Sequence, residues 1–65
     1  MPSMVISGFK YDVDTQVLRI YFVSGMVYDY KNVPHHVYEA MTKAFSKGTY
    51  LNRYIKGHYD FEKVN

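Results

Sequence analysis

The sequence contains no cysteine, and its 65 residues include only 2 prolines and 4 glycines. Without cysteine the chain has neither the disulfide framework that small secreted domains use nor a thiolate zinc site, so we expect a reducing, cytoplasmic setting. A chain of this length has too little interior for two cores. We therefore predict a single domain over residues 1–65 and exclude most enzyme architectures.

Long apolar runs and glycine-rich loops are also absent. The longest apolar run covers residues 20–23, whereas a helix needs about 20 residues to span a bilayer. Residues 1–8 do not have the pattern of a signal peptide. The glycines are isolated, so no loop of the kind that holds nucleotide phosphates is indicated. We predict no membrane contact and no cofactor.

What the sequence does have is an uneven charge and many tyrosines. The net charge is +2, but residues 1–30 have an excess of acids and residues 31–65 an excess of bases. Residues 43–58, which we call the basic segment, contain no acid and four bases: Lys43, Lys47, Arg53 and Lys56. The 8 tyrosine hydroxyls need partners or water, so several rings are expected to be half exposed. Because so small a core stabilises a fold weakly, formation of a homodimer is one way to gain burial.

Alternation of apolar and polar residues predicts three consecutive antiparallel strands, over residues 6–11, 17–22 and 26–31. Residues 12–16 contain aspartates and a threonine, which suit the turn between the first two strands. Residues 58–64 alternate weakly and are predicted to add an edge strand. The apolar faces of the three strands consist of Phe9, Tyr11, Leu18, Ile20, Phe22, Met26, Tyr28 and Tyr30.

The register of the second hairpin follows from the position of Asp29. A two-residue loop would place Asp29 opposite Ile20 on the apolar face, and a one-residue slip moves every side chain to the other face. A three-residue loop, with Gly25 in the left-handed conformation, instead pairs Ile20 with Tyr28 and Arg19 with Asp29. We predict the three-residue loop.

Two helices are predicted to follow the strands. Pro34 suits the first position of a helix over residues 34–47, and Gly48 suits its end. Thr49 is predicted to cap a short second helix over residues 50–56, which Gly57 closes. The first helix has an apolar stripe that would cover the sheet, formed by Val37, Tyr38, Met41, Ala44 and Phe45. The fold class is therefore α+β: an antiparallel three-strand meander with an additional edge strand, packed against one helix and followed by a short second helix.

No group of residues indicates catalysis or metal binding. Ser46, His58 and Asp60 can be named as nucleophile, base and orienting acid, but any chain of this length contains such a trio. His35 and Glu39 share a helix face, yet no third ligand has a suitable spacing, and His35 and His36 point about 100° apart. We predict that the protein is not an enzyme and holds no metal.

Two surfaces are candidates for nucleic-acid binding. Tyr28 and Tyr30 have the spacing of a base-stacking pair on a sheet, but the predicted register favours a core role for both. On the open face of the sheet, the better candidates are Arg19, Tyr21 and Lys31.

The other surface is the basic segment, with Phe45, Tyr50 and Tyr54 interleaved among its bases. At about 100° per residue, Tyr50, Leu51, Tyr54 and Ile55 share the packing face of the second helix. The opposite side, near Lys47, presents Asn52, Arg53 and Lys56. These residues either contact phosphates or form a solvated, solubilising face.

Several short motifs in order resemble the KTSC domain family: Tyr11-Asp12, Leu18, Ser24-Gly25, Tyr28-Asp29-Tyr30, Val33-Pro34, Val37-Tyr38 and residues 46–52. The resemblance covers roughly residues 6–61, and Leu51 departs from it where an aromatic is common. The family takes its name from the C-terminus of some lysyl-tRNA synthetases and also includes small bacterial proteins. It implies no established site residues, and it suggests RNA binding only through its attachment to a tRNA-handling enzyme. We therefore expect non-catalytic nucleic-acid binding, to RNA or another single strand, with a protein–protein interaction module as the alternative.

Overall fold

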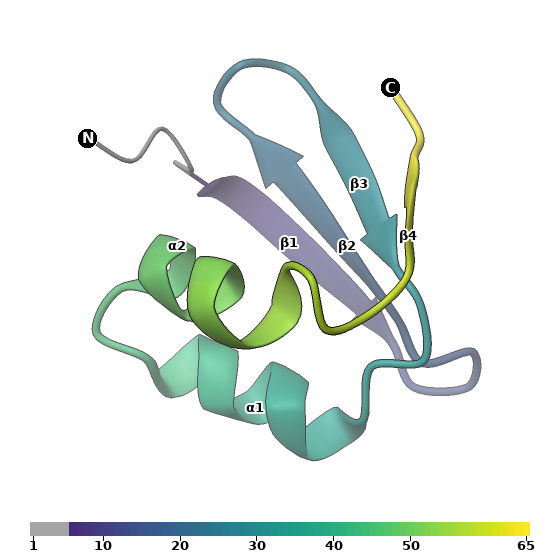
Figure 1. Cartoon of the computed structure of the whole chain (residues 1–65), viewed down its shortest axis with the longest axis vertical. Coiled ribbons are helices and arrows are strands. Elements are labelled where there is room, and N and C mark those ends of the chain that lie inside the picture. The colour runs from purple at the N-terminus through teal and green to yellow at the C-terminus, as the bar shows by residue number, and fades with distance from the viewer. Residues whose placement is uncertain (1–5) are drawn as a thin grey trace.

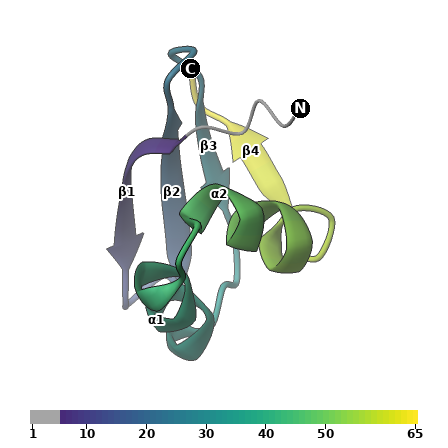
Figure 2. The ribbon, with the colours of Figure 1, turned by 90° about the vertical axis from the view of Figure 1, so that its left-hand side faces the viewer.

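The computed structural model describes residues 6–65 as a four-stranded antiparallel sheet with helices on one of its faces (Figure 1). The strands β1 (Ile6–Asp12), β2 (Val17–Phe22), β3 (Val27–Tyr30) and β4 (Phe61–Lys63) lie side by side in chain order. Between β3 and β4 come α1 (His35–Lys43), α2 (Lys47–Tyr50) and the π-helical segment η1 (Leu51–Ile55), which form the second layer in Figure 2. The predicted α+β class, the three-strand meander and the additional edge strand are confirmed.

The hairpin of β2 and β3 has the predicted register. Ile20 pairs with Tyr28 and Arg19 pairs with Asp29. Gly25 has a φ of 99°, the left-handed conformation that the three-residue loop requires. The register directs Asp29 to the open face of the sheet and the two neighbouring tyrosines toward the helices.

One hydrophobic core lies between the sheet and the helices. Its residues come from β2, β3, the segment before α1, and two of the three helical elements, α1 and η1. Each is at most 6% exposed: Leu18, Ile20, Phe22, Tyr30, Val33, Met41, Leu51 and Ile55. Full burial of an aliphatic side chain of this size contributes about 1.5–3 kcal/mol, so these contacts fix the helices on the sheet.

The first helix is shorter than predicted. Pro34 is the residue before α1 rather than its first residue, and α1 ends at Lys43 instead of residue 47. Ala44 is already extended, with φ −69° and ψ 144°, and its N–H donates to the Met41 carbonyl at 3.1 Å. Phe45, predicted on the apolar stripe, is consequently fully exposed at 107%.

The second helical segment begins earlier than predicted because Ser46, and not Thr49, is its N-cap. The Ser46 hydroxyl accepts the Thr49 N–H at 3.3 Å. Gly48, predicted to end the first helix, therefore lies inside α2. At the other end, Lys56 N–H donates to the Leu51 carbonyl at 2.7 Å, which makes the last turn π-helical. Gly57 follows with φ 84°, as its predicted role of closing the helix requires.

Within residues 6–65, no helix is long and apolar enough to cross a membrane.

Candidate nucleic-acid interface

The basic segment forms much of the helical layer. It runs from the last residue of α1 through the loop 44–46, α2 and η1 to the turn at Gly57 (Figure 1). Leu51 and Ile55 are fully buried, and this anchors the segment to the core. The side of the segment away from the core presents Asn52, Arg53, Tyr54 and Lys56, which are all exposed.

The structure leaves three of the four basic-segment candidates on the surface. Asn52, Arg53 and Lys56 are exposed, whereas Lys47, the first residue of α2, is half-buried. At 1.5 Å per residue, Lys47 and Arg53 are separated by about 9 Å along the axis. The candidates are therefore spread along the segment rather than gathered at one point.

The cations of the basic segment are not neutralised by the rest of the fold. Within residues 6–65, none of its lysines or its arginine lies within 4.0 Å of a carboxylate. The ion pairs of that part of the chain are Arg19 with Asp29, Lys31 with Glu62, and His35 with Glu39. The positive charge of the segment therefore remains available to an anionic partner.

Two aromatic side chains of the basic segment are also accessible. Phe45 is fully exposed, and Tyr54, predicted on the packing face, is 51% exposed. The Tyr54 ring lies against Tyr50, with centroids 4.7 Å apart and planes at 40°. Exposed rings next to unpaired cations are the combination that proteins use to bind single strands without sequence preference.

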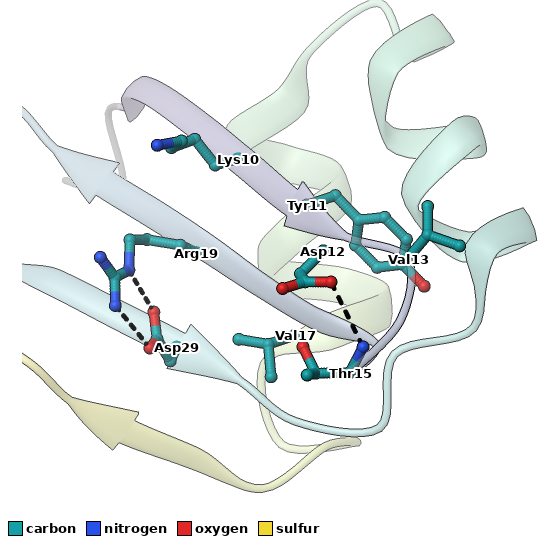
Figure 3. A pocket seen from close by; sticks show the side chains of 8 residues that line it. All are labelled: Lys10, Tyr11, Asp12, Val13, Thr15, Val17, Arg19 and Asp29. Carbon is teal, nitrogen blue, oxygen red and sulfur yellow. Dashed lines mark hydrogen bonds and ion pairs between the residues drawn. The ribbon is translucent and has the colours of Figure 1, made fainter.

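The open face of the sheet has a different character, because its arginine is already paired (Figure 3). Arg19 Nε and its terminal amino group donate to the two carboxylate oxygens of Asp29 at 2.7 and 2.9 Å. These bonds hold the pKa of Asp29 below its ordinary value and raise that of Arg19. A shallow hollow of about 560 Å³ lies beside this pair, with Lys10 at its rim.

The other two open-face candidates are no better placed to bind an anion. Lys31 lies 3.1 Å from a carboxylate oxygen of Glu62, and Tyr21 is half-buried within the sheet. Since both Arg19 and Lys31 have an acidic partner, part of the positive charge of each is cancelled and its attraction for a phosphate is reduced. The open face is therefore the weaker of the two candidate surfaces.

The residues named for catalysis are not brought together. Ser46 and His58 lie at opposite ends of the helical segment 47–55. The Ser46 hydroxyl donates to Thr49 Oγ1 at 3.0 Å, and His58 Nε2 lies 3.2 Å from the Arg53 carbonyl oxygen. Both side chains thus have structural partners, and neither contacts Asp60 in the hydrogen bonds of the described residues.

The named metal ligands also remain apart from any third donor. His35 Nδ1 lies 4.0 Å from a Glu39 oxygen, and residues 6–65 contain no cluster of three groups that could hold a metal ion. This is the spacing of two neighbours four residues apart on the surface of a helix.

The two sheet tyrosines are structural. Tyr30 is only 1% exposed, and burial raises the pKa of its hydroxyl. Tyr28 is half-buried and stacks on Phe61, with ring centroids 5.0 Å apart and planes at 17°. The Tyr30 ring is closed to a base and one face of the Tyr28 ring is already covered by Phe61, which favours the basic segment as the candidate site.

Sequence reasoning missed the exposure of Phe45. The signal that could have found it is the pair Ser46 and Thr49, because a serine three residues before a helical N–H is a typical N-cap. A cap at Ser46 requires the chain to leave the first helix before that residue, and Phe45 then lies in the connecting loop.

Comparisons with known proteins agree with this fold. The model of the KTSC domain family matches residues 2–59. A KTSC domain protein from Yersinia pestis has a similar structure, with a TM-score of 0.88 and 32% identity, covering 100% of this chain and 92% of that one. An uncharacterised protein from Stutzerimonas stutzeri is 32% identical over 100% of this chain and 93% of its own length.

Larger proteins contain a similar region. A lysine–tRNA ligase from Nostoc punctiforme is 46% identical over 61 residues, and one from Trichormus variabilis is 40% identical over 60 residues. These matches cover 94% and 92% of this chain but only 11% of each ligase. The similarity therefore concerns a small part of each ligase.

Proposed function

The chain belongs to the KTSC domain family, and from that premise we propose that it is a non-catalytic module that binds single-stranded RNA through its basic segment. The observation that carries the proposal is the charge of that segment, whose cations have no carboxylate partner within residues 6–65. The proposal includes a cytoplasmic location, which the absence of cysteine favours.

The contrast between the two surfaces supports this choice of site. A carboxylate next to a cation cancels part of its positive charge, so a paired cation attracts a phosphate less strongly than an unpaired one does. Arg19 and Lys31 are in that position, and Arg53 and Lys56 are not. The similarity to a region of lysine–tRNA ligases supports RNA as the nucleic acid.

The proposed contacts set the strength of binding and its salt dependence. Lys47, Arg53 and Lys56 each neutralise one phosphate of a single strand, while Asn52 donates a hydrogen bond from its amide. The logarithm of the binding constant then falls with the logarithm of salt concentration at a slope of about −0.7 per contact, or roughly −2. With so few contacts, binding is weak and largely independent of sequence.

The test is to titrate labelled single-stranded RNA at several salt concentrations. Replacing Arg53 and Lys56 together by alanine should reduce the magnitude of the slope by about 1.4. Their side chains are exposed, so thermal stability should be nearly unchanged. The matched control replaces Lys10 and Lys63, two exposed lysines outside the segment, and changes the net charge by the same amount.

The two double variants separate a local contact from a general charge effect. If the salt slope of RNA binding is the same for both double variants, the phosphate contacts are not made by Arg53 and Lys56, and the proposal is contradicted. Absence of RNA binding by the parent protein would favour the alternative, a protein–protein interaction module, whose apolar contacts do not weaken steeply with salt.

A further inference from the structure

Phe45 is the most exposed of the large apolar side chains in residues 6–65. Its exposed fraction is 107%, whereas the others reach at most 65%. The backbone of the flanking residues is extended, which carries the ring away from both α1 and α2. No aromatic contact of the described residues includes it. The ring thus has no structural role within the part of the chain that the structure describes.

The neighbours of Phe45 are cations. Lys43 and Lys47 flank it at two residues on either side, and two residues span at most about 7 Å. Lys43 ends α1 and Lys47 begins α2, so the loop that carries the ring has a lysine at each of its two ends. No acid occurs in residues 43–58 to oppose an anionic ligand.

The size of the exposed surface indicates what kind of partner fits. A phenylalanine buries about 150–250 Å² when it is covered, whereas a stable protein interface needs about 800 Å² from each partner. One ring is therefore too small for a protein interface by itself, but it matches the flat face of one nucleobase, and the flanking cations suit the phosphates beside that base.

We propose that Phe45 stacks on an unpaired nucleobase of the bound strand, so that the basic segment binds single-stranded RNA in preference to duplex. This inference rests on the RNA binding proposed above and adds the part of the ligand that is recognised. Bases in a duplex are paired and stacked on each other, and their faces are not available to a protein ring. An unpaired base offers its face to the ring regardless of its identity.

The experiment compares two labelled strands, a single-stranded RNA and the same sugar–phosphate chain without bases. Phe45→Ala should weaken binding to the first by about fivefold or more and leave binding to the second unchanged. The salt slope should be the same as for the parent, because no charge is removed. Phe45→Leu should weaken binding to the RNA as much as Phe45→Ala does, since leucine is apolar but has no aromatic face.

The control variant is Val23→Ala, which removes an apolar side chain that is 65% exposed in the β2–β3 loop and should bind as the parent does. Thermal melting of each variant checks that the fold is retained.

Each alternative result has a distinct meaning. Unchanged affinity of Phe45→Ala for RNA, with the parent slope intact, would overturn stacking and leave the proposed function standing. An equal loss for the base-free strand would also overturn it, because the ring would then act on the backbone. Full rescue by leucine, together with concentration-dependent association that alanine abolishes, would assign the ring to a contact between two copies. A parent protein that binds no RNA would overturn both proposals.

Discussion

At the scale of single residues, Tyr11 connects the first strand to the segment that leads into the helices. Its hydroxyl donates to the Val33 carbonyl at 2.6 Å, and its ring stacks on Tyr38 with centroids 4.6 Å apart and planes at 8°. Val33 itself is fully buried. One side chain thus satisfies a backbone acceptor and holds α1 against the edge of the sheet.

Replacing Tyr11 by phenylalanine should destabilise the fold by about 1 kcal/mol, because the ring contact is kept and only the hydrogen bond is lost. Urea unfolding at neutral pH measures the change. Tyr54→Phe is the matched control, since that ring is half exposed and no hydrogen bond of its hydroxyl is observed in the described residues. If both variants unfold at the same urea concentration, the Tyr11 hydroxyl does not contribute to stability.

At the scale of the elements, the end of the helical segment depends on one backbone conformation. Gly57 has φ 84°, and a methyl group added to it would meet no atom within 4 Å. Gly57→Ala should therefore cost roughly 1–2 kcal/mol through backbone conformation alone, and Gly57→Asn less, because asparagine tolerates the left-handed region.

Thermal or urea unfolding of these variants tests the prediction. The control is Gly8→Ala in β1, where the added methyl group would meet only Tyr21 Cδ2 at an ordinary 3.8 Å. It should cause no loss, because alanine restricts the unfolded chain and fits the strand. A Gly57→Ala protein as stable as the parent would show that the turn after η1 can adopt another conformation.

The elements differ in how far they could be predicted from the sequence. The hairpin register was predictable because Asp29 fits only one face and Gly25 only one loop, so two local constraints agreed. The break between the first helix and the second helical segment was not. The apolar spacing continues through Ala44 and Phe45, but the cap at Ser46 and the burial of residues 51 and 55 favoured a break that leaves Phe45 in water. The apolar spacing within one helix cannot show that a cap and burial in the next helix will outweigh it.

For the candidate site, the exposure of two cations was predictable from the sequence, and the surroundings of the other candidates were not. The exposure of Arg53 and Lys56 follows from helix periodicity alone. The neutralisation of Lys31 by Glu62 depends on β4 pairing with β3, because that pairing brings together residues that are far apart in the sequence. The full exposure of Phe45 likewise depends on where the first helix ends.

At the scale of the whole molecule, Asp29 and Tyr30 contribute to the pH dependence of stability. The hydrogen bonds from Arg19 lower the pKa of Asp29, so the unfolded chain takes up this proton first as the pH falls. Burial raises the pKa of Tyr30, so the unfolded chain loses that proton first as the pH rises. The Asp29 contribution is therefore lost as pH falls below its ordinary 3.8. The Tyr30 contribution is lost as pH rises above 10.0.

Removing either ionisable group should change the pH dependence of folding stability at one end of the pH range only. Asp29→Asn should be less stable than the parent at about pH 7, and the difference should narrow at about pH 2.5. Tyr30→Phe should lose less stability than the parent between about pH 10 and 11.5. Urea unfolding across this range gives both comparisons, with Asp14→Asn as the control for an exposed carboxyl in a turn. If the parent and Asp29→Asn differ in unfolding free energy by the same amount at both pH values, the charge of the carboxyl does not contribute to stability.

The arrangement of the sheet has a consequence for a domain of this kind within a longer chain. Ile6 pairs with Phe22, and the Asn65 amide donates to the Gly25 carbonyl at 3.1 Å, so both residues lie at the β2–β3 hairpin end of the sheet. The helices cover the sheet toward its other end (Figure 1). Under the function proposed above, a flexible tether at this end would place the helical layer at an effective concentration of about millimolar beside RNA held by the same chain. The few phosphate contacts proposed for this surface would then be made through avidity, although each contributes little affinity by itself.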